Sequence, residues 1–207
     1  MRDLLTEIAE TAREVARRGG GEDELVAVTV RREYPAAVDD VWTAVTDPAR
    51  LARWFAPVTG DLRAGGTFAV EGNADGEIRA CSPPSTLVLT WGAPVSVVTV
   101  RLTAAGGATL LELEHTVPVA FAGSGAGALF VGPGWDVALL GLGLHLRGED
   151  VGDPVAWEGG EEVRRAGAAS IDAWVATVTA SGTATPEEVA GGEVAARAQF
   201  TPEPTAG

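Results

Sequence analysis

The stretch from residue 28 to residue 68 constrains the fold most, because it holds a strand, two short helices and the start of a hairpin within about forty residues. Valine recurs at every second position over about 25–34, which is the period expected of a half-buried strand. Apolar residues then recur at helical spacing, and an Asp-Pro pair at positions 47 and 48 is typical of a helix start. The rest of the chain must therefore pack against this strand and these two helices.

Each of the two short helices carries a tryptophan. Trp42 lies in the strict apolar stripe of the first helix, so we predict that it is a core residue that anchors this helix to the sheet. Trp54 and Phe55 lie on the apolar face of the second helix. We predict that these two residues form a wall or lid of a cavity.

A series of short apolar-alternating segments follows, up to about residue 115, and turns rich in Gly, Asn, Asp and Pro separate them. Short turns between such segments indicate neighbouring antiparallel strands. The pattern predicts one antiparallel meander of six or seven strands, with one apolar face and one face exposed to solvent.

Residues 116–135 carry no charge and lead into the apolar run WDVALLGLGLHL. The uncharged stretch is long enough to suggest a membrane span, but its prolines and glycines make it a poor one. We expect a mobile loop over about 122–134, followed by a helix that is apolar on all sides and therefore buried. The simplest arrangement lays this helix across the concave face of the sheet.

The ends of the chain are predicted to be helical. An amphipathic pattern spans residues 3–18 and stops at three glycines, and a second apolar stripe runs from Glu161 to Ala180. The sequence Thr-Pro-Glu-Glu at 185–188 is typical of a capped helix start. The tail 201–207 is predicted to be disordered.

The composition narrows the function classes. The formal net charge is −14, and the basic residues, all arginines, number 15 against 29 acidic residues, so binding to nucleic acid or to an anionic membrane is not expected. Cys81 is the single cysteine, which excludes an intrachain disulfide and is consistent with a protein of the reducing cytoplasm. The acidic N-terminus does not resemble a secretory signal peptide. Two histidines and one cysteine, all far apart in sequence, predict no metal site, and we expect no cofactor.

Five motifs in order, YPAAVDDVWTAVTDPARLARWF, DLRAGGTF, PPSTLVLTW, GATLLELEHT and GPGWDVALLGL, resemble the SRPBCC (START/birch-pollen-allergen-like) superfamily. Within it, the sequence is most similar to the branch named after the activator of heat-shock protein 90 ATPase. The resemblance implies an α+β helix-grip fold, in which a curved antiparallel sheet of six to seven strands wraps around a long helix. The implied organisation is an N-terminal helical extension (1–24), a helix-grip domain (25–147), a C-terminal helical extension (148–200) and the disordered tail. The extensions look similar to those of bacterial members of the branch.

Members of the superfamily share a cavity between the sheet and the long helix, so the resemblance implies that this chain binds a small hydrophobic molecule there. The residues expected to line that cavity are Trp54, Phe55, Phe68, Val70, Trp91, Val100, Leu113, His115, Trp135, Leu139 and Leu142. His115 has two interpretations: a general acid or base, or a structural histidine whose hydrogen bonds are satisfied at the cavity mouth.

Two other function classes stay open. One is a cyclase-like or dehydratase-like enzyme that uses the same cavity, with His115 as its candidate catalytic residue. The other is a chaperone-associated or other protein-interaction module, in which the terminal helices contact a protein partner or form a homodimer. The namesake activator depends on a separate N-terminal domain, and residues 1–24 are too short to supply one.

Overall fold

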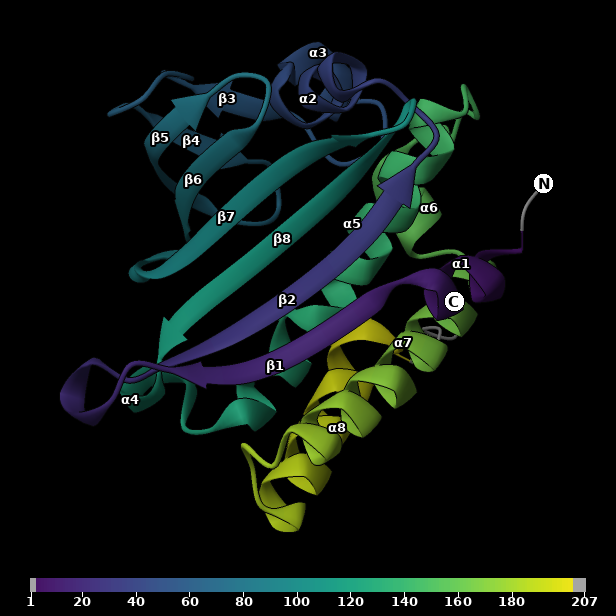
Figure 1. Cartoon of the computed structure of the whole chain (residues 1–207). Coiled ribbons are helices and arrows are strands. Elements are labelled where there is room, and N and C mark those ends of the chain that lie inside the picture. Colours follow the sequence, from purple (N-terminus) through teal and green to yellow (C-terminus); the bar gives the residue numbers. More distant parts are fainter. Residues whose placement is uncertain (1–2, 203–207) are drawn as a thin grey trace.

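The computed structural model describes residues 3–202, which form one curved sheet with helices gathered on one side of it (Figure 1). The strands are β1 (Ala12–Arg18), β2 (Leu25–Tyr34), β3 (Val58–Gly60), β4 (Thr67–Val70), β5 (Asp75–Ser82), β6 (Thr86–Trp91), β7 (Ala93–Ala105) and β8 (Ala108–Pro118). The helices are α1 (Leu4–Glu10), α2 (Val38–Thr46), α3 (Pro48–Leu51), α4 (Val119–Ala122), α5 (Gly132–Leu146), α6 (Pro154–Glu158), α7 (Glu161–Ser181) and α8 (Pro186–Phe200), with 3-10 turns η1 (Gly21–Asp23) and η2 (Gly125–Phe130).

The sheet has the order β1-β2-β8-β7-β6-β5-β4-β3, and every neighbouring pair is antiparallel. This arrangement confirms the predicted α+β helix-grip fold. The sheet has eight strands where six or seven were expected, because β1 extends one edge and the short β3 extends the other.

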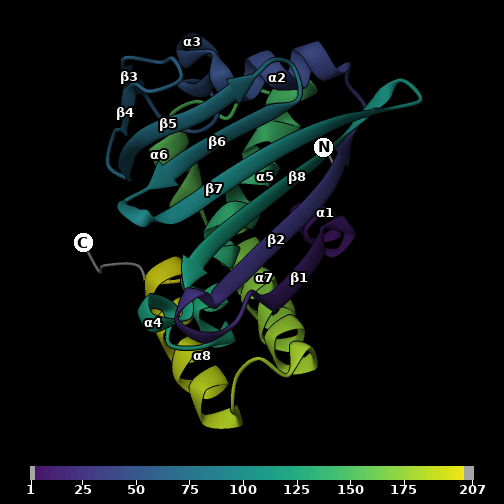
Figure 2. The ribbon, with the colours of Figure 1, turned by 60° about the vertical axis from the view of Figure 1, so that its left-hand side comes forward.

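The main core lies between the sheet and α5, which runs across the sheet's concave face (Figure 2). Leu139 and Leu142 of α5 pack in one cluster with the inward side chains of β2, β7 and β8, and Trp42 of α2 is buried in the same cluster, as predicted. The Tyr34 hydroxyl donates to the Leu139 carbonyl at 2.9 Å, which ties β2 to the helix.

The helix predicted over 3–18 is wrong in its second half. Only α1 is helical, and residues 12–18 form β1, which pairs with β2 so that Val15 faces Val28 across the ladder. In a strand, alternate side chains share one face, so Arg13 and Val15 both point inward from β1. Val15 is buried in the core and Arg13 reaches a carboxylate on α5.

The loop predicted over 122–134 is also wrong, because η2 and the first turn of α5 occupy most of it and pack in the core. Ala128 and Leu129 are fully buried. Gly132 is needed beneath Trp174 of α7, since a Cβ there would lie 2.4 Å from the indole. The stretch Gly125–Leu146 could cross a membrane by length and composition, but 61% of its apolar window is buried inside the fold, as in a core helix.

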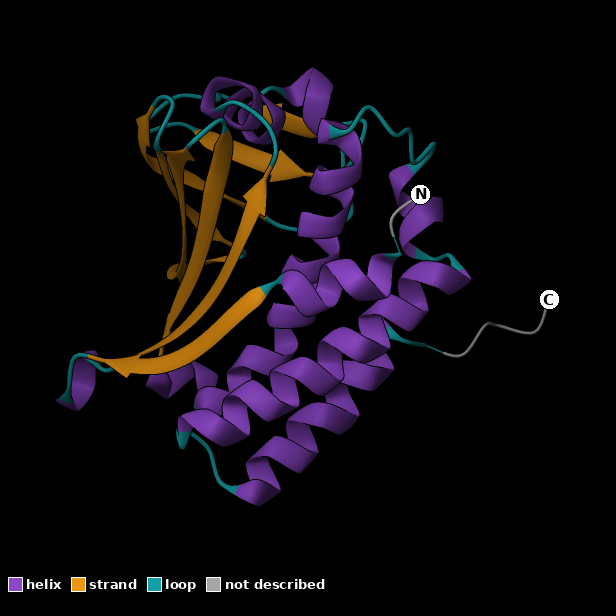
Figure 3. Ribbon diagram, turned by 45° about the vertical axis from the view of Figure 1, so that its right-hand side comes forward, coloured by secondary structure: helices purple, strands orange, loops and turns teal. Residues whose placement is uncertain are grey.

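The helices α7 and α8 form a second layer against α5 and β1 (Figure 3). Ile171 and Trp174 of α7 are fully buried in the main core cluster. The predicted capping box is present: Glu188 N donates to Thr185 Oγ1 at 3.2 Å, and Thr185 N donates to the Glu188 carboxylate at 2.7 Å. The C-terminal segment therefore completes the core of the sheet and α5. The tail predicted to be disordered lies, from residue 203, outside the described residues.

Candidate functional site

A chain of aromatic rings runs from the end of α3 across the sheet to α5. Phe55 follows α3, Trp91 ends β6 and Trp135 lies in the first turn of α5. Ring centroids are 6.4 Å apart for Phe55 and Trp91 and 5.0 Å apart for Trp91 and Trp135, and Phe68 of β4 lies 6.0 Å from Trp91. Tilted pairs at these separations are favourable contacts, so the rings support one another as a wall.

A groove of about 650 Å³ opens beside this wall. Phe55, Trp91 and Trp135 form one end of it, and α5 forms its floor. Helices α6, α7 and α8 close the other side, where Phe200 adds a further ring. The polar side chains of the lining are Asn73, Glu158, Arg164 and Gln199.

A second, smaller pocket of about 130 Å³ lies between α2–α3 and strands β3–β6. Its lining is almost entirely apolar and includes Leu51, Phe68 and Val70. Phe55 and Trp91 line both hollows, so these two rings form the partition between them.

The predicted lining residues divide into three groups. Phe55, Trp91 and Trp135 line the groove, and Phe68 and Val70 line the small pocket. The others line neither hollow: Trp54, Val100, Leu113, His115, Leu139 and Leu142.

The space directly between the sheet and α5, where the cavity was predicted, is filled by core side chains that include Val100, Leu113, Leu139 and Leu142. Trp54, predicted as a wall or lid, is a core residue instead. The residue is 6% exposed, and its indole N–H donates to the Ala44 carbonyl at 3.1 Å. The hollow lies to one side of α5 instead, where residues of α6, α7 and α8 form its far wall.

His115 of β8 is buried and both of its ring nitrogens have partners. The Trp135 indole N–H donates to Nδ1 at 3.2 Å, and Ser96 Oγ lies 2.7 Å from Nε2. An indole nitrogen can only donate, so Nδ1 must be the unprotonated nitrogen and Nε2 donates to Ser96. Burial lowers the pKa of His115 to about 4, so the ring is neutral at pH 7. Both hydrogen-bonding positions of the His115 ring are thus taken by side chains. One of these bonds holds the Trp135 indole in the groove wall.

Two buried ionic clusters were missed from the sequence. Asp136 of α5 accepts from Arg13 Nε at 2.8 Å, from Trp174 Nε1 at 3.0 Å and from the Ser170 hydroxyl. Burial raises the pKa of Asp136, and these three donors act against that rise. The available signal was that Asp136 is the one Asp, Glu, Lys or Arg between Glu114 and Arg147, in a helix that is apolar around it.

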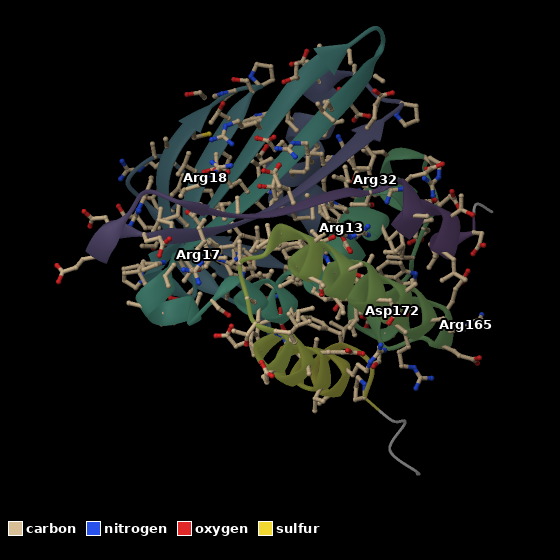
Figure 4. All side chains as sticks on the ribbon, turned by 60° about the horizontal axis from the view of Figure 1, so that its bottom comes forward. Arg13, Arg17, Arg18, Arg32, Arg165 and Asp172 are labelled. Atoms are coloured by element: carbon tan, nitrogen blue, oxygen red, sulfur yellow. The ribbon has the colours of Figure 1, made fainter. Side chains whose placement is uncertain are left out.

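In the second cluster, the Glu7 carboxylate of α1 pairs with Arg32 of β2 and with Arg147 Nη2, the latter at 2.8 Å. Arg13 and Arg32, labelled in Figure 4, extend from the first two strands toward the helices. These clusters join α1, β1, β2, α5 and α7, and they position the floor of the groove without lining it.

The groove residues of the C-terminal segment were also missed. Glu158, Arg164 and Phe200 lie beyond the motifs that suggested the fold, so no motif pointed to them. Within residues 3–202, no group of three or more His, Cys, Asp or Glu side chains is arranged to hold a metal ion.

Comparison with known proteins gives consistent results. The family model described as Activator of Hsp90 ATPase homolog 1-like protein matches residues 35–143. The crystal structure of CalU16 from Micromonospora echinospora is 38% identical, with a TM-score of 0.66, over 82% of this chain and 98% of CalU16. The solution structure of CalU16 is 39% identical, with a TM-score of 0.68, over 83% and 97% of the two chains.

A more distant structure is that of DynU16, a protein in the dynemicin biosynthetic locus. It is 29% identical, with a TM-score of 0.54, over 58% of this chain and 47% of DynU16. Among curated proteins, none matches the chain.

Proposed function

This chain belongs to the family of activator of Hsp90 ATPase homolog 1-like proteins, and we propose that it binds a small hydrophobic molecule in the groove beside α5. The observation that carries the proposal is the groove itself, at about 650 Å³ with Phe55, Trp91 and Trp135 at one end. Sites for small molecules are typically concave and apolar, with volumes of about 300–1,000 Å³ and a few polar groups that fix orientation.

The small pocket extends this binding surface. It adds about 130 Å³ of apolar space behind the Phe55–Trp91 partition. Because Phe55 and Trp91 line both hollows, we propose that a ligand with an apolar tail displaces one of these rings and reaches under α2 and α3. Burying such a tail contributes about 25 cal/mol per Å² of apolar surface.

One relative supports a ligand that belongs to a biosynthetic pathway. DynU16 is a protein in the dynemicin biosynthetic locus. By extension, we propose that the ligand of this chain is a product or intermediate of the pathway that a biosynthetic locus encodes. We propose that the protein binds this ligand in the cytoplasm of a bacterium.

Filling the groove tests the proposal. Gly159 lines the groove, and a side chain at this position would meet only ordinary contacts, so Gly159→Trp places an indole in the groove without disturbing the backbone. The matched control is Gly191→Trp, on the exposed side of α8, where a Cβ meets nothing within 4 Å. The probe is the neutral fluorescent dye N-phenylnaphthylamine.

We expect the wild type and Gly191→Trp to bind the dye with the same affinity, and Gly159→Trp to bind it at least about tenfold more weakly, a loss of about 1.4 kcal/mol. Equal affinity in all three proteins would place the dye elsewhere and would contradict the proposal.

The two other function classes find less support in the geometry. An enzyme that uses His115 as acid or base needs that ring at a hollow, whereas it lines neither one and both of its nitrogens are engaged. An interaction module that uses the terminal helices would have to use their outer faces, because Ile171, Trp174 and Val189 are buried within the chain.

A further inference from the structure

Arg164 is an unpaired cation in the wall of the groove. It projects from α7 into the lining, and its Nε atom is buried without a hydrogen-bond partner. Its side chain forms no hydrogen bond or ion pair with any other residue in the range 3–202. A buried donor without an acceptor is unfavourable, so this guanidinium is ready to bind an acceptor that enters the groove.

Most other arginines of this acidic chain do form ion pairs with carboxylates, unlike Arg164. Acidic residues number 29 against 15 basic ones, so carboxylates are abundant. Ten arginines do form ion pairs with them: Arg13, Arg17, Arg18, Arg31, Arg32, Arg50, Arg63, Arg101, Arg147 and Arg197. Glu158 lines the same groove and yet forms no ion pair with Arg164.

We propose that Arg164 binds an acidic group of the ligand, so that the ligand class is an aromatic or polycyclic molecule that carries a carboxylate or a similar oxygen anion. This inference rests on the proposed function and deepens it. The rings of Phe55, Trp91 and Trp135 hold the apolar body at one end, and Arg164 receives the anion on the side of α7. A planar guanidinium matches a two-oxygen anion in geometry as well as in charge.

Glu158 shares the groove lining with Arg164, so an acidic ligand held there would meet it. It is the acidic residue in the groove lining, and burial raises the pKa of its carboxyl group. An anion at Arg164 therefore meets a carboxyl group that takes up a proton more readily than usual. We expect Glu158→Gln to tighten the binding of an anionic probe and to leave the binding of a neutral probe unchanged.

Two dyes with one skeleton test the inference. Anilinonaphthalene sulfonate carries an anionic group, and N-phenylnaphthylamine is the same ring system without it. Both are titrated by fluorescence into the full-length wild type, into Arg164→Gln and into Arg165→Gln. Arg165, the neighbouring arginine on α7, is labelled in Figure 4 and is exposed and outside the groove lining, so it is the matched control.

We expect Arg164→Gln to weaken binding of the sulfonate dye by about tenfold, the effect of losing one charge-assisted hydrogen bond. Binding of the neutral dye should stay within about twofold of wild type, which also shows that the variant is folded. Arg165→Gln should leave both affinities unchanged, and Arg164→Lys should restore part of the sulfonate affinity.

The experiment separates a failure of the role of Arg164 from a failure of the proposed ligand binding in the groove. If Arg164→Gln leaves sulfonate binding unchanged, or weakens both dyes equally, the role of Arg164 is overturned while groove binding stands. If the wild type binds neither dye, the proposed function is overturned and the inference falls with it.

Discussion

At the scale of single residues, His115 shows how burial changes the function of a side chain. The ring is 2% exposed, its Nδ1 accepts from Trp135, and its pKa falls to about 4. The predicted position of His115 on the inner face of its strand was correct, but the residue serves to orient Trp135. Sequence periodicity places a side chain on a face, but it does not reveal which neighbours take up its hydrogen bonds.

This arrangement predicts a pH dependence of stability. The pKa of His115 is about 4 when folded against an ordinary value of 6.5, so the unfolded chain binds a proton more readily between these values. The stability that neutral His115 contributes is therefore fully present above pH 6.5 and is lost as the pH is lowered to about 4. At about 1.4 kcal/mol per pKa unit, the loss is on the order of 3 kcal/mol.

The measurement is urea unfolding of wild type and His115→Gln across this pH range. The other titrating groups are common to both proteins, so the wild-type advantage in free energy of unfolding should shrink as the pH falls. An advantage that stays constant from pH 7 to pH 4 would show that His115 does not remain neutral.

At the scale of elements, β1 is the clearest case in which tertiary structure overrides a local pattern. Residues 12–18 have good helix propensity, yet the free edge of β2 pairs with them and Val15 fills the core. The decisive partner of Arg13 is Asp136, more than a hundred residues away. A contact of that range cannot be seen in a window of sequence, so the helix prediction failed here and succeeded for α7, whose apolar stripe is local.

The ion pair between β1 and α5 gives an element-scale prediction. The side chains of Arg13 and Asp136 are 6% and 0% exposed, so Arg13→Met leaves a buried carboxylate without its cation. We expect a loss of about 3–5 kcal/mol in the free energy of unfolding, measured in urea.

The control on the same strand is Arg17→Met. Arg17 pairs with Glu24 at 3.3 Å between side chains that are 40% and 28% exposed, so its loss should cost about 1 kcal/mol or less. Equal losses for the two variants would mean that the buried pair does not hold β1 and α5 together.

At the scale of the whole molecule, the sequence predicted the helix-grip architecture and the groove-lining rings Phe55, Trp91 and Trp135, but not the position of the hollow. The motifs that indicated the fold end near residue 146, and α6, α7 and α8 follow them. These helices supply Arg164 and Phe200 to the groove, while the main core fills the space where a cavity was expected. How completely side chains fill that space depends on three-dimensional packing, which a linear pattern does not encode.

The central claim is that the groove beside α5 is a ligand site, and the indole N–H signals of the six tryptophans report on it separately. The most direct measurement is a titration of N-phenylnaphthylamine into nitrogen-15-labelled protein. The account predicts the largest shifts for Trp91 and Trp135, which line the groove, and small ones for the core residues Trp42 and Trp174. Saturation with dye that leaves Trp91 and Trp135 unmoved, or that moves all four equally, would contradict it.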